Sequence, residues 1–418
     1  MRKKLVLGAV ATVLTVGAVP LVQAEPIAVV EPRTIVFNGE GNNLDIYDVT
    51  DLDDVREREL VPAANRGGLD MNAQICFKEI DGVTYFINGE DTAQGGAGDP
   101  GWGWFELTGD TFDTLGVMQL GKLVPEYVPN EVSGEENYGC GFLSNGNLVT
   151  SEVGDQYPGL PNTGELILWF HDGEGGFTQG FGHDENGIPH GAVPSCHLDT
   201  GVATSGGILI REENGEEVIY LASNRPGNDG NTGGIFRYSN IPTTLEDCAS
   251  ATVTKELAIP AAPYTGITPS ALAEAPNGNL YMSSVFDGVI SEWTLVDAPL
   301  GSQWVHVRNL IGPPAGTPAA QFGDSFGSFV PPLDTELTDG TPFGIGVGPD
   351  GTVYYADIGI ALAAPMPGAG DVYAIAFDGA GNPLPPQKLN TTGQEFPDGI
   401  GVVQLDLITR ACCGWEIG

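Results

Sequence analysis

Oxygen-bearing side chains stand at recurring places along the chain and could together bind a cation. The residues that we assign to this site are Asn72, Glu152, Asn224, Asp357 and Asp398. Carboxylate, amide and backbone oxygens are the ligands of Ca²⁺, which accepts about six to eight of them. We therefore predict a central Ca²⁺ site. The structural alternative is that these residues cap strands and turns, as Asp and Asn commonly do.

A cluster of histidines offers a general base. Three of the five His residues fall within residues 183–199, and neutral imidazole titrates near about 6.5. We predict that this segment is a loop over the same site, from which His190 or His197 activates water. The alternatives are transition-metal ligands or loop histidines that bond to the backbone. The sequence lacks the motifs of serine hydrolases, of P-loop and Rossmann enzymes and of zinc proteases.

A repeated hairpin pattern must position these residues. The clearest copy, residues 341–357, is a short apolar strand, a Pro-Asp-Gly turn and a strand rich in Val and Tyr that ends at an acidic residue. Residues 268–284 and 137–152 repeat it, weaker copies begin near positions 72 and 205, and a truncated copy begins at 397. The first strands of the copies start at Asn72, Tyr138, Ser205, Ser270, Phe343 and Asp398.

The spacing of these copies predicts an all-β fold, a six-bladed β-propeller. The first four steps are 65 to 73 residues long and the last is 55, with four strand-like runs per unit. N-terminal strands at residues 33–37 and 44–48 would complete the truncated blade, close the ring and remove an exposed sheet edge. The alternative is an open sandwich of unrelated hairpins. In a propeller, the strand starts and the loops after the second strands meet at one face of the channel, where the predicted ligands belong.

The composition limits the partners of the protein. The 418 residues include 55 acidic and 16 basic side chains, for a formal net charge of −39. Such a charge repels phosphates, so we expect neither nucleic acid nor an anionic membrane as a partner. The 41% apolar content suffices for a core, and 61 Gly with 31 Pro indicate many turns. We expect one propeller domain over residues 25–418, in a monomer.

The first 24 residues have the pattern of a signal peptide. A basic start precedes an apolar run over residues 5–21 and a small-residue cleavage signal. No later apolar run reaches the roughly 20 residues of a membrane span, so we expect a secreted or periplasmic protein. An even number of cysteines in such a compartment indicates disulfides of unassigned pairing. They are Cys76, Cys140, Cys196, Cys248, Cys412 and Cys413.

Two hairpins resemble a known group of propellers. Residues 349–357 and 276–284 are similar to the blade signature of the SMP-30/gluconolactonase, NHL and strictosidine-synthase-like group. The segment Pro397-Asp398-Gly399 resembles the motif that supplies a metal-binding and catalytic Asp in SMP-30-like lactonases, so the resemblance implies that role for Asp398. The family's Pro-Asn-Gly ligand motif is absent from the strand starts here, and Glu40 loosely matches its early Glu.

These features favour a secreted, Ca²⁺-dependent hydrolase of a lactone or another small-molecule ester. Asp398 is the only acid among the six strand starts, and a carboxylate facing a narrow channel is costly unless a cation or donors pair with it. The bound metal would polarise the carbonyl, and Asp398 or a histidine would activate water. The alternatives are a non-catalytic propeller that binds a ligand or partner on its channel face and a quinoprotein-type sugar dehydrogenase. The scarcity of basic residues to hold an anionic cofactor disfavours the latter.

Overall fold

The computed structural model of the chain is almost entirely β-structure. It describes residues 28–40, 43–61, 73–89, 102–125, 137–152, 164–177, 182–183, 189–202, 205–223, 233–260, 269–285, 288–297, 302–312, 321–322, 329–330, 341–358, 360–361, 364–365, 370–394 and 397–410. Within these ranges the chain forms thirty strands and one short helix, α1 (Leu245–Cys248). The predicted signal peptide and both Cys412 and Cys413 lie outside the described residues.

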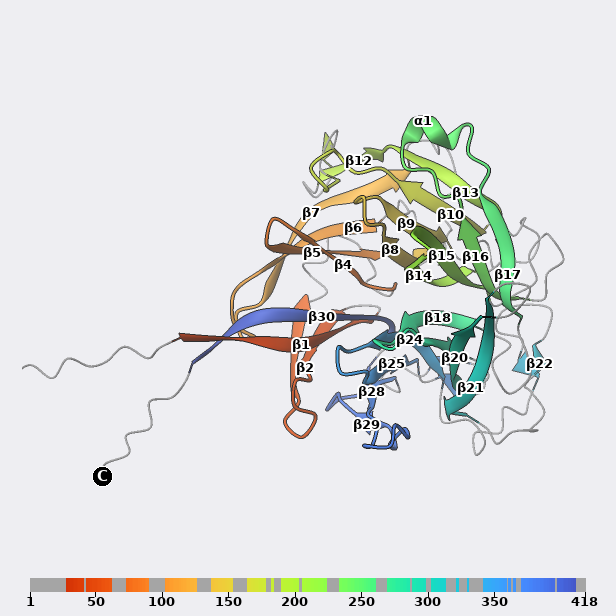
Figure 1. Cartoon of the computed structure of the whole chain (residues 1–418). Helices are drawn as coiled ribbons and strands as arrows, with labels where there is room; N and C mark the ends of the chain where they lie inside the picture. Colours follow the sequence, from red (N-terminus) through yellow and green to blue (C-terminus); the bar gives the residue numbers. More distant parts are fainter. Residues whose placement is uncertain are drawn as a thin grey trace, which may run out of the picture.

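Six sheets form the blades of the propeller (Figure 1). Blade 1 is β4 (Cys76–Ile80), β5 (Val83–Gly89), β6 (Trp102–Thr108) and β7 (Gly116–Pro125), extended by β12 (Pro189–Val193) and β11 (Gly182–His183). Blade 2 is β8 (Asn137–Phe142), β9 (Leu148–Glu152), β10 (Gly164–Trp169) and β13 (Ser195–Val202). Blade 3 is β14 (Ser205–Glu213), β15 (Glu216–Ser223), β16 (Gly234–Ser239) and β17 (Thr254–Pro260).

The second half of the ring repeats this plan. Blade 4 is β18 (Pro269–Glu274), β19 (Leu280–Ser284), β20 (Val289–Val296) and β21 (Gln303–Ile311). Blade 5 is β24 (Pro342–Val347), β25 (Val353–Asp357), β28 (Asp371–Ile375) and β29 (Gln387–Lys388). Blade 6 is β30 (Pro397–Arg410), β1 (Ala28–Glu40), β2 (Asn43–Asp48) and β3 (Arg56–Val61). The hairpins β22–β23 (Gln321–Phe322, Phe329–Val330) and β26–β27 (Ile360–Ala361, Ala364–Pro365) are separate.

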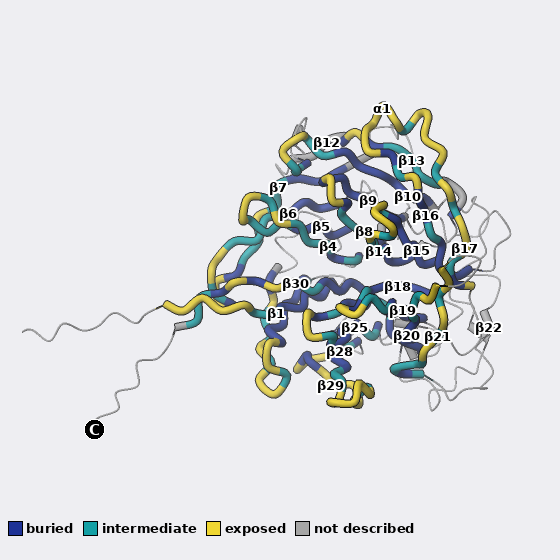
Figure 2. Tube along the Cα trace, in the orientation of Figure 1, coloured by how far each residue is buried: buried dark blue, intermediate teal, exposed yellow. Residues whose placement is uncertain are grey.

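The first strand of each blade lies innermost. These strands contact one another in the closed order β4, β8, β14, β18, β24, β30 and back to β4. Figure 2 shows that the strands around this ring are largely buried, whereas the outer turns are exposed. The prediction of a six-bladed propeller is therefore confirmed.

The hairpin turns follow from local chemistry. Asp81 and Gly82 have φ angles of 51° and 80°, and Asn214 and Gly215 have 54° and 84°. A two-residue turn with both angles positive matches the twist of paired strands, and Asp-Gly and Asn-Gly adopt it readily. The conformation of these turns is therefore determined by their own two residues and can be predicted directly from the sequence.

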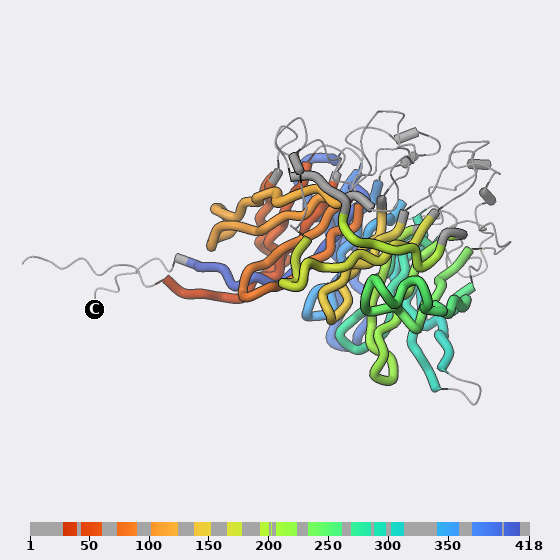
Figure 3. The backbone as a smooth tube through the Cα atoms, turned by 90° about the horizontal axis from the view of Figure 1, so that it is seen from above, coloured from red at the N-terminus to blue at the C-terminus, as the bar shows by residue number. Residues whose placement is uncertain are grey.

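Both ends of the described chain close the ring, as predicted. The C-terminal β30 is the innermost strand of blade 6, and β1 pairs with it from Ala28–Arg410 to Glu40–Pro397. The outer strands β2 and β3 also come from the N-terminal segment. Figure 3, turned by 90° from Figure 1, shows the paired ends of β1 and β30 projecting from one side of the propeller.

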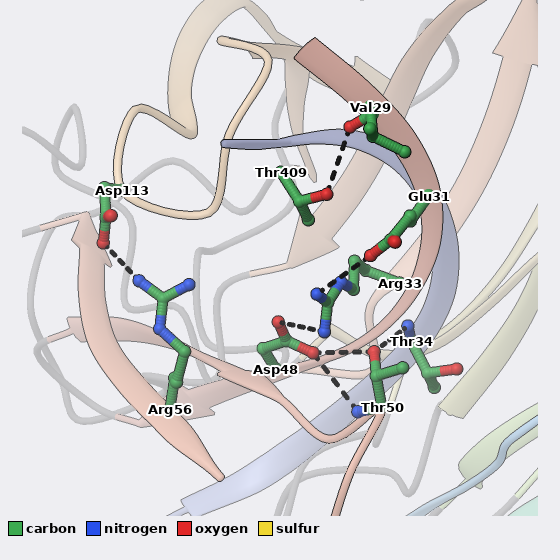
Figure 4. Close-up of polar contacts among 9 residues, drawn as sticks. All are labelled: Val29, Glu31, Arg33, Thr34, Asp48, Thr50, Arg56, Asp113 and Thr409. Atoms are coloured by element: carbon green, nitrogen blue, oxygen red, sulfur yellow. Dashed lines mark hydrogen bonds and ion pairs between the residues drawn. The ribbon is translucent and has the colours of Figure 1, made fainter. Parts of the chain in front are cut away.

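Polar contacts fasten blade 6 near this projection (Figure 4). The buried Asp48 Oδ1 accepts hydrogen bonds from the backbone N–H and the hydroxyl of Thr50, at 3.2 and 2.7 Å. Arg33 Nη1 lies 3.7 Å from Asp48 Oδ2, and Arg56 pairs with Asp113 of blade 1 at 2.5 Å. The closing blade is thus held by charged contacts as well as by its strand ladder.

Two disulfides lie among the described cysteines. Cys76–Cys140 joins the inner strands of blades 1 and 2. Cys196–Cys248 joins the outer strand of blade 2 to α1. The expectation of disulfides is confirmed for these four cysteines, and their pairing is a finding of the structure.

Candidate functional site

Buried aromatic and acidic residues meet where the inner strands start. Tyr138 of blade 2 donates a hydrogen bond from its hydroxyl to the backbone carbonyl of Asp398 in blade 6, at 2.8 Å. Its ring packs edge-on against Phe343 of blade 5, with 4.7 Å between centroids. Tyr138 and Asp398 are each only 1% exposed. Side chains of blades 2 and 5 and the backbone of blade 6 therefore meet at this level.

Asp398 is held by close packing of backbones. Its carbonyl lies so near Gly344 of the preceding inner strand that a Cβ on that glycine would collide with it. Asp398 is a buried residue, and burying a charged carboxylate is costly unless a cation or hydrogen-bond donors compensate. Its position is the predicted one, at the start of β30.

The backbone of Asp357 lies near Pro397, the residue before Asp398, in the neighbouring blade. Around Gly370, a Cβ would meet Pro397 and, at 3.1 Å, the backbone carbonyl of Asp357. Asp357 Oδ1 accepts hydrogen bonds from the backbone N–H and the hydroxyl of Thr341, at 3.0 and 2.7 Å. One carboxylate oxygen of Asp357 therefore ties down the chain just before β24, as the structural alternative expects.

Two further acidic residues end strands at the same end of the channel. Glu40 is the last residue of β1 and pairs with Pro397, next to Asp398. Glu152 is the last residue of β9 and pairs with Asn137, next to Tyr138. The side chains of both glutamates, and the predicted ligands Asn72 and Asn224 altogether, lie outside the described residues.

Asn88 is a candidate ligand that the sequence-based set leaves out. It is fully buried near the end of β5, and its Nδ2 donates to the carbonyl of Ala73 at 2.8 Å. Within the described part of the chain its Oδ1 has no hydrogen-bond partner, and such a buried acceptor is uncommon. Its place in blade 1, near the end of a second strand, corresponds to that of Asp357 in blade 5. This position in the repeat is the sequence signal that could have identified Asn88 as a candidate ligand.

Serine side chains link neighbouring inner strands by hydrogen bonds. Ser151 Oγ accepts from Gly139 N at 2.8 Å and donates to the Gly206 carbonyl of blade 3 at 2.7 Å. Ser283 likewise accepts from Ala271 N at 3.0 Å and donates to the Phe343 carbonyl of blade 5. Each serine lies in the second strand of its blade and connects the inner strand of that blade to the inner strand of the next one. Residues at the strand starts are thus fixed relative to one another.

The histidine-rich segment is not the predicted loop over the channel. It forms β11, β12 and β13 at the outer edges of blades 1 and 2. His197 lies in β13, three strands outward from β8, or roughly 14 Å at the usual strand spacing. Its Nδ1 lies 3.1 Å from Glu165 Oε2. His190 lies in β12, opposite Lys122 of β7 in a parallel pair.

The loop prediction is therefore wrong, because this segment completes two sheets through long-range pairing. The general-base role of His190 and His197 stays a prediction, and we place neither residue in the site proposed below. Among the residues that the structure describes, no group of three or more His, Cys, Asp and Glu side chains is arranged to hold a metal ion. In the same part of the chain, no helix is long and apolar enough to cross a membrane.

Comparison with known proteins identifies the fold. No protein-family profile and no curated protein matches the chain. The chain is similar to the periplasmic gluconolactonase of Pseudomonas aeruginosa, with 13% identity, a TM-score of 0.50 and coverage of 89% of this chain and 99% of that chain. It is also similar to a protein of unknown function from Bacteroides caccae, with 12% identity, a TM-score of 0.44 and coverage of 89% and 99%. The resemblance to gluconolactonase-like propellers is confirmed at the level of fold.

Proposed function

We propose that this protein is a secreted or periplasmic, Ca²⁺-dependent hydrolase of a lactone or another small-molecule ester. The observation that carries the proposal is Asp398, a carboxylic acid residue 1% exposed at the start of an inner strand. The five equivalent positions hold no acid. The fold is compatible with this chemistry, since a similar propeller is a gluconolactonase, although a fold alone does not determine function.

The donor set suits a hard cation. Asp398, Asp357 and the buried Asn88 Oδ1 supply oxygen atoms, and the strands place Glu40 and Glu152 at the same end of the channel. No described residue hydrogen-bonds to Asn88 Oδ1, which is the condition expected of an amide oxygen that serves a ligand. Oxygen donors of this kind fit Ca²⁺ better than a soft metal.

Bound Ca²⁺ would polarise the ester carbonyl and stabilise negative charge on its oxygen. Asp398 would accept a proton from the attacking water while the water oxygen bonds to the carbonyl carbon. The acyl–oxygen bond then breaks, and the alkoxide takes the proton, so a lactone yields a hydroxy acid. Tyr138, hydrogen-bonded to the Asp398 carbonyl at 2.8 Å, would keep bulk water from entering through the channel.

The two disulfides support the proposed location. Both Cys76–Cys140 and Cys196–Cys248 are formed in the structure, and structural disulfides persist mainly in oxidising compartments. The signal-peptide pattern of residues 1–24 is the second support. Both observations support secretion or export to the periplasm.

The test compares two buried aspartates. Asp398→Asn keeps the size of the side chain but removes its charge, and we expect loss of Ca²⁺ binding by calorimetry and of turnover on a panel of lactones and esters. Asp48→Asn is the matched control, because Asp48 is 4% exposed and lies in blade 6 among Thr50 and Arg33. The control should retain both properties. An Asp398→Asn variant that binds Ca²⁺ and turns over substrate like the parent contradicts the proposal.

A parent protein that binds Ca²⁺ but hydrolyses nothing in the panel would favour the non-catalytic alternative. Metal content of the purified protein, measured by mass spectrometry, separates that outcome from a protein without metal. Circular dichroism and melting curves of both variants establish that any loss comes from the site and not from unfolding.

A further inference from the structure

A cavity lies toward the opposite end of the inner strands from Asp398. All six inner strands line it, and its volume is about 380 Å³, within the usual range for small-ligand pockets. We call it the lower well. Each strand contributes apolar side chains to its wall, among them Phe77, Phe142, Ile210, Leu272, Val347 and Val402.

The side-chain amide of Gln74, which is hydrogen-bonded to the backbone, lies between the lower well and the strand starts. Gln74 lines the well, and its Oε1 accepts from the backbone N–H groups of Cys140 and Ile208, at 3.2 and 3.0 Å. Its Nε2 donates to the Ile208 carbonyl at 3.1 Å. The hydrogen bond from Tyr138 to Asp398 crosses the channel beyond it. A molecule in the lower well therefore meets apolar walls and is distinct from a ligand near Asp398.

Among the described residues that line the lower well, Glu274 is the only charged one. Its Oε1 lies 3.4 Å from Arg211 Nη2, and Arg211 Nε also lies 3.6 Å from Glu213 Oε1. Glu213 pairs more closely with Arg237 Nε, at 2.8 Å, so Arg211 is left chiefly to Glu274. Burial raises the pKa of Glu274 above its usual range; Arg211 opposes this change and Glu213 adds to it. The Glu274 carboxylate therefore has one cation beside it, and because burial still outweighs this pair, a second cation would be favourable.

Glu274 is the place in the well where a positively charged ligand would be most favourable. On the wall formed by Phe142, the Lys78 ammonium already lies 5.2 Å from the centroid of the Phe142 ring, so a second positive charge is not favoured there. The formal net charge of −39 also favours cations over anions near the protein. Apolar walls with one carboxylate match a molecule with an apolar body and one positive end.

We propose that the lower well binds an organic ammonium ion, with its aliphatic or aromatic body between the inner strands and its ammonium at Glu274. Binding removes apolar surface from water and gives the carboxylate a charged hydrogen-bond donor. This inference does not depend on the proposed hydrolase, because it concerns other residues and the other end of the channel.

The first experiment titrates n-alkylamines from hexylamine to decylamine into the full-length protein by calorimetry at physiological salt. Burial of each added methylene should tighten binding roughly fourfold until the well is full. The alcohol of the same length should bind about tenfold more weakly, because it lacks the charge that pairs with Glu274. Affinity that is independent of chain length, or equal for amine and alcohol, would overturn the proposal.

Two variants locate the site. Glu274→Gln should weaken amine binding about tenfold and leave alcohol binding within about twofold. Its control is Glu212→Gln, which removes the same charge from an exposed residue of β14 that does not line the well. Val402→Phe narrows the well and should weaken amine and alcohol alike. Parent-like amine binding in both Glu274→Gln and Val402→Phe, with unchanged melting curves, would refute the inference.

Discussion

Removal of the hydrogen bond from Tyr138 to the Asp398 carbonyl tests how much this contact between blades 2 and 6 stabilises the fold. Tyr138→Phe removes only the hydroxyl and keeps the edge-on packing of the ring against Phe343. A typical hydrogen bond contributes about 0.5–1.5 kcal/mol, and a buried acceptor left without its donor costs about 1–3 kcal/mol. Both residues are 1% exposed, so water cannot easily replace the lost donor. We expect the free energy of unfolding to fall by about 1–3 kcal/mol.

Urea denaturation, followed by far-ultraviolet circular dichroism, measures this loss. With a denaturant slope of about 3 kcal/mol per molar, the midpoint should fall by about 0.3–1 M. Tyr85→Phe is the control, because the Tyr85 ring stacks on Trp104 at 5.0 Å and no described residue hydrogen-bonds to its hydroxyl. That variant should stay within about 0.5 kcal/mol of the parent. Equal midpoints for Tyr138→Phe and the parent would refute the view that this bond fastens the channel.

Three further predictions concern closure, disulfides and metal. Deletion of residues 25–48 removes β1 and β2 of blade 6, so no soluble, cooperatively folding monomer should be recovered; a well-folded monomer on size exclusion would contradict ring closure. The Cys76→Ser/Cys140→Ser variant should lose roughly 4 kcal/mol of unfolding free energy, because it opens a loop with a sequence separation of 64. An unchanged urea midpoint would count against this. Excess chelator should lower the melting temperature of the purified protein, since a bound ion stabilises only the state that binds it. An identical melting curve, with no metal found, would end the Ca²⁺ proposal.

Local chemistry explains how much of the fold could be predicted. Asp81-Gly82 and Asn214-Gly215 form turns with both φ angles positive, and such turns depend on the two residues themselves. The repeat spacing then fixes the number of blades, and the truncated last copy predicts closure by the N-terminal strands. Each of these inferences needs only nearby sequence or its periodicity.

Long-range pairing explains what could not be predicted. The segment that contains His190 and His197 includes Asn186-Gly187, Pro189 and Pro194, which favour a turn or loop, and its own sequence does not indicate pairing with outer strands. Its position is set by pairing with Lys122 of β7 and with Ile167 of β10. The disulfide partners and the unsatisfied Asn88 Oδ1 are also properties of folded neighbours. The position of Asp398, by contrast, followed from the repeat alone.

Two consecutive positions of the same repeat obey different packing constraints. The second position is small because the inner strands approach closely: a Cβ on Gly139 would collide with the Gly206 carbonyl, and one on Gly344 with the Asp398 carbonyl. The first position has no such limit, and its residues differ widely between blades. Packing therefore does not require the acid at 398 or the tyrosine at 138, yet both are buried there and in contact. Residues that the repeat does not need, and that are costly to bury, are where selection for function is the simpler explanation.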